Sequence, residues 1–277
     1  MIDTTRLRRL IDRLQPRAQP IDRPALVPLR MAGAEIGHAA PEVARRLAAD
    51  CKGFALDNGT LVVRGEGETF EERSAFLARA SLFLRDTGLL HGWRDELLAV
   101  RAGAGPAAIA AIERAACRPL GITTSAVHLN AFADHQTLIV ARRAAHKQID
   151  PGLWDSLVGG MVPAGETVAQ ALEREAHEEA GISLDGIPLQ AGRKLHIHRA
   201  VPEGFQSEII HIFDATIDGS RKIKNEDGEV AAFEWRSIAD VVEAIEHDQF
   251  TLEAALVTLE TLTRRTGDQT PDGLYVE

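Results

Sequence analysis

Three glutamates near the middle of the 277-residue chain have the spacing of one helix face. At helical spacing, Glu175 and Glu179 continue the stripe that the apolar residues Val168 and Leu172 begin. An ordinary amphipathic helix does not replace its apolar stripe with carboxylates. Because Glu178 lies three residues after Glu175 and next to Glu179, we expect the three carboxylates to converge on one volume.

Converging carboxylates need a compensating positive charge, because they repel one another and raise one another's pKa. Ligands that are all oxygen suit Mg²⁺ or Mn²⁺ better than zinc, and Mg²⁺ keeps several waters and takes substrate phosphate oxygens as further ligands. Arg174, four residues before Glu178, is placed to hold a carboxylate by a charge-assisted bond. The pair Gly159 and Gly160 lets backbone groups approach a ligand closely. The alternative is a solvated acidic helix.

The segment from Gly160 to Ile182 resembles the Nudix box, the signature of the Nudix hydrolase family. It reads Gly, five residues, Glu, seven residues, Arg-Glu, apolar, any, Glu-Glu, any, Gly, apolar, and every position is met. Glu166 is its first glutamate, and Ala176 stands where a larger aliphatic residue is common. Seven fixed residue types, each with a background usage of roughly one in fifteen, match such a chain by chance about once in a million. This rarity disfavours the solvated acidic helix.

The resemblance implies roles for the residues of the box. Glu175, Glu178 and Glu179 match the family's metal-binding glutamates, and Glu175 is also the position that serves as general base in some members. Arg174 matches the arginine that orients the carboxylates, and the Gly159 carbonyl is a further candidate metal ligand. The predicted catalytic residues are therefore Glu175, Arg174 and Glu178, with Mg²⁺ or Mn²⁺ as the cofactor.

Nudix enzymes often add one more carboxylate from a loop outside the box. Glu226 and Glu229 are the candidates in this chain. We prefer Glu229 as a metal ligand because it opens the strand that follows the loop. A plain acidic turn without a ligand is the equal alternative at this place.

Motifs ahead of the box are similar to those of a Nudix subgroup linked to thiamine pyrophosphokinase, which carries an added N-terminal domain. They are Val127-His-Leu-Asn130, Val140-Ala-Arg-Arg-Ala144, Lys147 and Pro151-Gly-Leu-Trp-Asp155, with Trp93-Arg-Asp-Glu-Leu97 in the added domain. The similarity implies an organic diphosphate with a cationic or heteroaromatic head, such as a thiamine diphosphate derivative.

Several residues in or beside these motifs are candidates for binding such a substrate. Arg142, Arg143 and Lys147 can neutralise a diphosphate, but they can equally be solvated surface cations. Trp93 and Trp154 can stack against a heteroaromatic head, although a tryptophan buried in a core is the commoner outcome.

The region before the box predicts a smaller, mostly helical α+β domain over residues 1–120. Apolar residues at helical spacing predict a helix over 70–85 and a second one over 106–117. The β-branched residues of 60–64 predict a strand, preceded by a turn at Asn58-Gly59.

Residues 121–277 form the predicted Nudix domain, an α/β fold in which the resemblance implies an α/β/α sandwich with a mixed sheet. Two strand-like runs, 126–132 and 137–141, predict a hairpin, and a helix follows over 167–180. Strands flanked by helices on both sides of the box indicate a layered α/β domain. His128 lies in an apolar strand, where a core or edge histidine is the commoner outcome.

Composition excludes several classes of partner. The net charge of −10 and the pI of about 5.5 disfavour nonspecific binding of nucleic acid. The N-terminus does not resemble a secretory signal, and no apolar run is long enough for a membrane span. Cys51 and Cys117 are the two cysteines, which fits a reducing compartment. We expect a soluble cytoplasmic enzyme with a small-molecule diphosphate as its partner, and a homodimer stays open.

The leading hypothesis is hydrolysis of a diphosphate linkage in a small organic or nucleoside diphosphate derivative. One alternative is a pyrophosphatase of ADP-ribose or nucleotide sugars, and another is a non-catalytic diphosphate-binding regulator, although such regulators tend to have degraded boxes. Isopentenyl-diphosphate isomerase resembles this architecture but uses a catalytic cysteine. Neither Cys51 nor Cys117 lies within the predicted Nudix domain, which counts against the isomerase.

Overall fold

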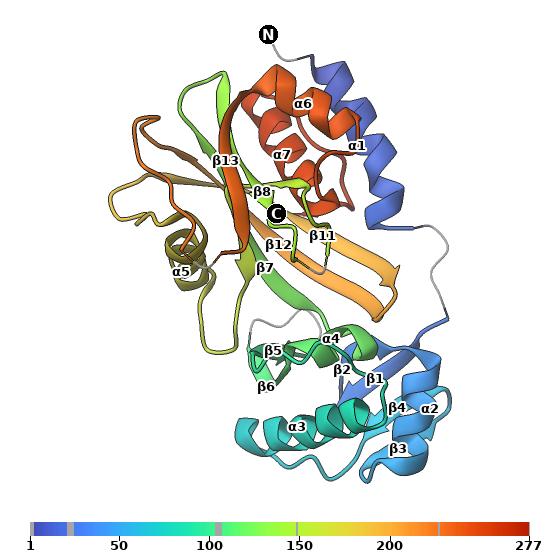
Figure 1. Ribbon diagram of the computed structural model, residues 1–277. Coiled ribbons are helices and arrows are strands. Elements are labelled where there is room, and N and C mark those ends of the chain that lie inside the picture. The colour runs from blue at the N-terminus through green and yellow to red at the C-terminus, as the bar shows by residue number, and fades with distance from the viewer. Residues whose placement is uncertain (1–2, 21–24, 103–106, 148, 227, 277) are drawn as a thin grey trace.

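The computed structural model describes residues 3–20, 25–102, 107–147, 149–226 and 228–276. They form two lobes (Figure 1). The upper lobe is built on a long sheet with helices on both faces, and the lower lobe on two smaller sheets with helices beside them. No helix among these residues is long and apolar enough to cross a membrane.

The lower, accessory lobe holds a four-stranded sheet in the order β2-β1-β4-β3 and a separate hairpin, β5-β6. Its strands are β1 (Val27–Met31), β2 (Ala34–Ala39), β3 (Phe54–Asp57), β4 (Thr60–Val63), β5 (Leu97–Arg101) and β6 (Ala108–Glu113). Its helices are α2 (Pro41–Asp50), α3 (Phe70–Asp86) and α4 (Arg114–Leu120). One apolar cluster joins these elements, so the accessory lobe has its own core.

Two of the local predictions for this lobe are confirmed. Helix α3 matches the predicted helix over 70–85, and it begins with a capping box in which Thr69 and Glu72 each bond the other's backbone N–H. The predicted turn at Asn58-Gly59 joins β3 to β4, and both turn residues have positive φ, 47° and 79°.

The predicted helix over 106–117 is wrong. Residues 108–113 form β6, which pairs antiparallel with β5, and the helix begins only at Arg114. Alanine-rich residues favour a helix locally, but Ala110 and Ile112 are fully buried against the rest of the accessory core. The tertiary pairing therefore overrides the local preference.

The upper lobe is an α/β/α sandwich on an eight-stranded mixed sheet, as predicted. The strand order is β13-β8-β7-β12-β11-β14, with β10 pairing β7 and β9 pairing β8; β7 and β12 are parallel, and the other pairs are antiparallel. The strands are β7 (Thr124–Phe132), β8 (Thr137–Arg143), β9 (Trp154–Asp155), β10 (Val158–Met161), β11 (Leu189–Val201), β12 (Gly204–Thr216), β13 (Val230–Ser237) and β14 (Tyr275–Val276). The predicted hairpin of 126–132 and 137–141 corresponds to β7 and β8.

Helices cover both faces of this sheet. Helix α5 (Val168–Ala180) packs on one face, against Val127 and Leu129 of β7. The opposite face, which includes Ala126 of β7, packs against α1 (Thr4–Ala18), α6 (Ile238–Glu246) and α7 (Leu252–Arg265). Alternate residues of β7 therefore serve the two cores.

Helix α1 belongs to the upper lobe, although it was predicted within an accessory domain spanning 1–120. Its buried residues Leu7, Leu10, Ile11 and Leu14 share one apolar cluster with α6 and α7. Figure 1 shows α1 beside these two helices, far from α2 and α3. The first helix of the predicted accessory domain therefore packs on the upper lobe, because its apolar stripe is buried against the sandwich.

Candidate functional site

Helix α5 carries the box glutamates and is fixed at both ends. Thr167 and Gln170 form a capping box at its start, and Gly181 ends it in the left-handed conformation with φ 63°. Ala171, Leu172 and Ala176 are fully buried on the sandwich core. This packing fixes the rotation of the helix.

Glu175 and Glu179 face the short strand β10. Glu175 lies so close to Gly160 that a Cβ on that glycine would be 2.0 Å from the Glu175 Cδ. Glu179 accepts a hydrogen bond of 2.8 Å from the backbone N–H of Gly159. Burial raises the pKa of both carboxyls, and that of Glu179 lies well above its usual range. The two glycines therefore let the partly buried Glu175 and the buried Glu179 approach the backbone.

Arg174 connects the remaining carboxylates of the box. Its Nε lies 3.1 Å from Glu166 Oε1, and its Nη1 lies 2.8 Å from Glu175 Oε1 and 3.0 Å from Glu178 Oε2. Nη2 donates to the Met161 carbonyl oxygen. The predicted bond between Arg174 and Glu178 is confirmed, and one guanidinium orients three carboxylates.

Glu175, Glu178 and Glu179 are not gathered around one point in this structure, and their role as metal ligands stays a prediction. Within the described part of the chain, no three His, Cys, Asp or Glu side chains are arranged to hold one metal ion together. The reason is that Arg174 draws Glu175 and Glu178 toward itself, whereas Glu179 is bound to Gly159.

The chemistry of these residues nevertheless fits a divalent cation. All of the donors are carboxylate oxygens, as Mg²⁺ and Mn²⁺ prefer. Arg174 shares a single positive charge among Glu166, Glu175 and Glu178. Negative charge on Glu175 also contributes to the raised pKa of Glu179, after burial. A cation beside these groups would relieve both the repulsion and the cost of burying charge.

Of the two loop candidates, Glu229 shares a cavity with the box residue Glu179. A small cavity of about 10 Å³ is lined by Glu229, Glu179, Lys147 and Arg143, among others. Lys147 forms an ion pair with Glu229, which lowers the pKa of Glu229 against the opposing effect of burial. These contacts bring together four of the predicted site residues.

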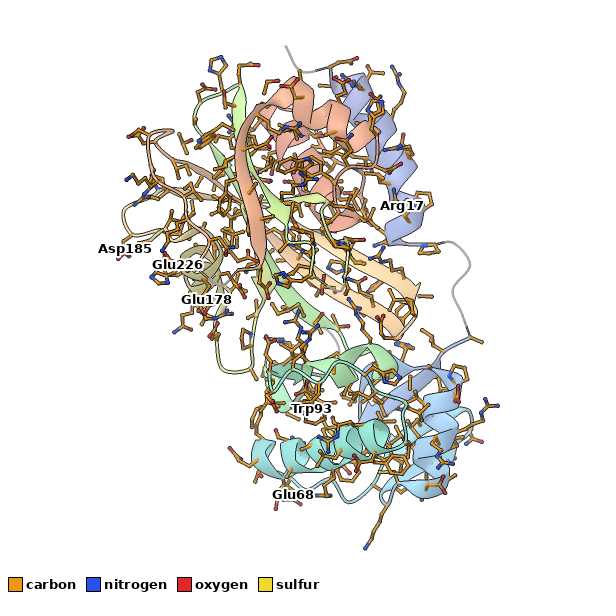
Figure 2. The ribbon with its side chains drawn as sticks, in the orientation of Figure 1. Arg17, Glu68, Trp93, Glu178, Asp185 and Glu226 are labelled. Atoms are coloured by element: carbon orange, nitrogen blue, oxygen red, sulfur yellow. The ribbon has the colours of Figure 1, made fainter. Side chains whose placement is uncertain are left out.

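Glu226 lies at the C-terminal end of α5. Its backbone N–H donates to the Glu178 carbonyl oxygen, and its carboxylate pairs with Lys224. Figure 2 shows Glu178 and Glu226 together at this end of the helix. Glu226 does not line the small cavity that Glu179 and Glu229 share.

Three of the predicted substrate-binding residues lie elsewhere. Arg142 projects from β8 on the side opposite Arg143, and its guanidinium lies 5.7 Å from the centre of the buried Trp154 ring. Trp93 belongs to the accessory lobe (Figure 2), where Arg85 covers its ring at 4.8 Å. Arg142, Trp154 and Trp93 do not line either of the two cavities described for this site. Trp154 is therefore a buried core residue, whereas Trp93 is only partly buried beside the accessory core.

A larger cavity of about 550 Å³ lies between the two lobes. The upper lobe contributes Gly159, Gly160, Arg143 and the buried His128. His128 bonds Ser156 at 3.1 Å, and burial lowers the pKa of its imidazole. Because Gly159 and Gly160 also contact the box glutamates, the large cavity reaches the box across β10.

No motif in the sequence indicated the residues that form the other walls of this cavity. Glu208 and Glu253 line it from the upper lobe, where Glu253 pairs with Arg199 at 3.0 Å. Arg114 and Arg118 line it from α4 of the accessory lobe. These residues lie far apart in the sequence and outside any motif, so only the packing of the lobes brings them together.

Comparison with protein families decides the identity of the upper lobe. Residues 121–256 match the NUDIX domain family, and this range includes the whole box. This chain belongs to the Nudix family. Residues 7–124 match a domain of unknown function, DUF4743. The Nudix chain therefore carries an additional N-terminal domain, which contains both helices and strands.

Relatives of known sequence include hydrolases and isomerases. The chain is 31% identical over 202 residues to Nudix hydrolase 20, chloroplastic, of Arabidopsis thaliana, covering 70% of this chain and 53% of that protein. It is 30% identical over 139 residues to the isopentenyl-diphosphate Delta-isomerase of Leifsonia xyli, covering 49% of this chain and 74% of that protein. The chain spans about half the length of the first two curated relatives it matches.

Among solved structures, DR0079 from Deinococcus radiodurans is similar at 20% identity with a TM-score of 0.42. The similarity covers 62% of this chain and 96% of that one.

Proposed function

We propose that this Nudix protein hydrolyses a diphosphate linkage in a small organic or nucleoside diphosphate derivative. The observation that carries the proposal is the pair of carboxyls of the partly buried Glu175 and the buried Glu179, which lie against Gly160 and Gly159 at the wall of the interdomain cavity. The box is complete, which favours an enzyme over a diphosphate-binding regulator.

Glu175, Glu178 and Glu179 would hold Mg²⁺ or Mn²⁺, with Glu229 as the added carboxylate. When bound, such a cation supplies an acidified water and neutralises charge on the phosphates. Arg174 orients Glu175 and Glu178 through bonds of 2.8 and 3.0 Å. Glu175 accepts the proton of the attacking water, a role that suits a carboxyl whose pKa is raised by burial.

The cavity supports a substrate larger than an inorganic diphosphate. Its volume of about 550 Å³ is within the usual range of roughly 300–1,000 Å³ for small-molecule sites. Arg143 lines both cavities, so it is the better placed of the two arginines of β8 to meet a phosphate. We keep a thiamine diphosphate-like compound as the proposed substrate on the resemblance of the outer motifs, with ADP-ribose and nucleotide sugars as the competitors.

Similarity to the isopentenyl-diphosphate isomerase of Leifsonia xyli makes isomerisation the second candidate. Cys117 reaches the wall of the cavity from the accessory lobe, but the residue is only 3% exposed. Burial raises the pKa of its thiol to about 12. A thiol so strongly protonated is a poor nucleophile, and these properties favour hydrolysis.

A substrate panel separates these activities. The purified full chain would be incubated with Mg²⁺ or Mn²⁺ and thiamine diphosphate analogues, ADP-ribose, nucleotide sugars or isopentenyl diphosphate. A hydrolase releases monophosphate or phosphate, whereas an isomerase rearranges isopentenyl diphosphate without releasing either. A tenfold higher kcat/KM for ADP-ribose, equivalent to about 1.4 kcal/mol, would overturn the thiamine-type substrate and leave the hydrolase intact.

A further inference from the structure

The accessory lobe is bonded directly to the Nudix box. The backbone N–H of Ala164, inside the box, donates to the Leu97 carbonyl oxygen of β5 at 2.7 Å. Leu98 forms an antiparallel bridge with Pro163, the residue before Ala164. Met161 of β10 also packs against the accessory core. These contacts fix the β5-β6 hairpin on the loop that joins β10 to α5 within the box.

The same hairpin positions Arg114 in the cavity between the lobes. Arg114 is the first residue of α4, and its backbone N–H donates to the Glu96 carbonyl oxygen at 2.8 Å. Its Nη1 lies 2.7 Å from Glu96 Oε2. The adjacent Glu113 is buried and accepts from the backbone N–H of Arg94 and of Ala115. The start of α4 is therefore held in place around Arg114.

Arg114 and Glu96 lie within electrostatic range of the Nudix carboxyls. The negative charge of Glu96 adds to the raised pKa of Glu175, whose main cause is burial. The positive charge of Arg114 helps to lower the pKa of Glu229, after the larger effect of Lys147 and against burial. The position of Arg114 follows from the cavity, which it lines together with Gly159 and Gly160 of β10.

A diphosphate beside the box needs cationic side chains that still have N–H donors outside their ion pairs with carboxylates. Arg174 bonds Glu166, Glu175 and Glu178, and Lys147 pairs with Glu229. A guanidinium has five N–H donors in a planar fork, and the ion pair between Arg114 and Glu96 uses Nη1. The side chain of Arg114 is 43% exposed and lines the cavity with Gly159 and Gly160.

We propose that Arg114 of the accessory lobe binds the diphosphate of the substrate, with Glu96 holding its guanidinium toward the cavity. This inference rests on the proposed function of the Nudix site. It makes the accessory lobe a part of the substrate site, supplied through the β5-β6 hairpin. Arg114 is then a binding residue that the Nudix domain by itself lacks.

The test compares Arg114→Gln and Arg114→Lys with Arg46→Gln in the full chain. Arg46 is the matched control, since it is an exposed helical arginine of the same lobe that pairs with Asp50 at 3.1 Å and does not line the cavity. We expect Arg114→Gln to lower kcat/KM at least tenfold, mainly through a higher KM, and Arg114→Lys to restore part of the loss. Arg46→Gln should match the wild type, and all variants should keep the wild-type Tm.

Binding of imidodiphosphate in the presence of Mg²⁺, measured by calorimetry, separates this inference from the proposed function. Weaker binding to Arg114→Gln than to the wild type supports the role of Arg114 even if no substrate on the panel is hydrolysed. Equal binding by the two proteins, or no binding by the wild type, would overturn it. Hydrolysis with the same KM in both proteins would also overturn it while leaving the hydrolase assignment in place.

Discussion

The carboxylate of Glu175 occupies the space that a side chain at Gly160 would need. A Cβ at Gly160 would lie 2.0 Å from Glu175 Cδ and 2.1 Å from Oε1, far inside van der Waals contact. Position 160 of the box therefore requires glycine, because the carboxylate of Glu175 leaves no room for a side chain there. Any need for the conformational freedom of glycine is a separate reason.

Gly160→Ala should consequently displace Glu175 and reduce hydrolysis at least tenfold. Overpacking should also cost about 1–3 kcal/mol of unfolding free energy. Gly219→Ala is the control, since its nearest neighbour, the Cβ of Ala133, would lie at an ordinary 3.4 Å. Initial rates and urea denaturation measure both effects. Wild-type turnover in Gly160→Ala would show that the position of Glu175 does not matter for the reaction.

Glu179→Gln should abolish turnover and make the protein more resistant to unfolding at alkaline pH. The folded state raises the pKa of Glu179, so it binds a proton that the unfolded state releases as the pH rises above the usual glutamate value. Wild-type stability is therefore lost as the pH rises through the folded pKa, and the uncharged glutamine avoids that loss. The glutamine oxygen can still accept the Gly159 N–H.

Urea denaturation at pH 5 and pH 8, without metal, measures this difference. Glu178→Gln is the comparison, because Glu178 is half-exposed and paired with Arg174, so the loss of its charge should change stability by at most about 1 kcal/mol in either direction. If the stability difference between Glu179→Gln and the wild type were the same at both pH values, Glu179 would not be a buried, proton-binding carboxyl.

The two loop glutamates should differ in their effect on metal dependence. Glu229→Gln removes a carboxylate from the cavity that Glu229 shares with Glu179. Glu226→Gln removes a carboxylate that pairs with Lys224 at the C-terminal end of α5. We expect the Mg²⁺ concentration for half-maximal rate to rise severalfold in Glu229→Gln and to stay unchanged in Glu226→Gln. The opposite order would make Glu226 the added carboxylate.

Helix α1 should be essential to the stability of the Nudix domain. Leu14→Ala should lower the unfolding free energy by about 2–5 kcal/mol, because Leu14 is 2% exposed within the core of the upper lobe. Arg9→Ala, on the exposed side of the same helix, should have little effect. Thermal unfolding of the two variants makes the comparison, and equal melting temperatures would mean that α1 contributes little to this core.

The sequence predicted the elements whose signals are local. The helix over 167–180, which is α5, and the turn at Asn58-Gly59 follow from residue types at short spacing. Strand β6 was mistaken for a helix because its pairing with β5 is a tertiary contact. For the same reason, the docking of α1 on the sandwich could not be read from the pattern of apolar residues alone.

In the candidate site, too, local features could be predicted from the sequence and tertiary contacts could not. The box motif identified Arg174 and its bond with Glu178, since both lie on one helix at i, i+4 spacing. Motif spacing could not reveal that Arg174 and Gly159 would separate the three glutamates. The contribution of Arg114 depends on the docking of a second lobe, which no local pattern encodes.

We propose that the Nudix box of this chain supports metal-dependent hydrolysis of a diphosphate. The most direct test of this proposal is steady-state release of phosphate or monophosphate by the full chain, with saturating Mg²⁺ and with excess chelator, alongside Glu178→Gln and Glu179→Gln. We expect turnover by the wild type with Mg²⁺, and none with chelator or in either variant. Near-wild-type turnover by either variant at saturating Mg²⁺, or undiminished turnover in chelator, would contradict it.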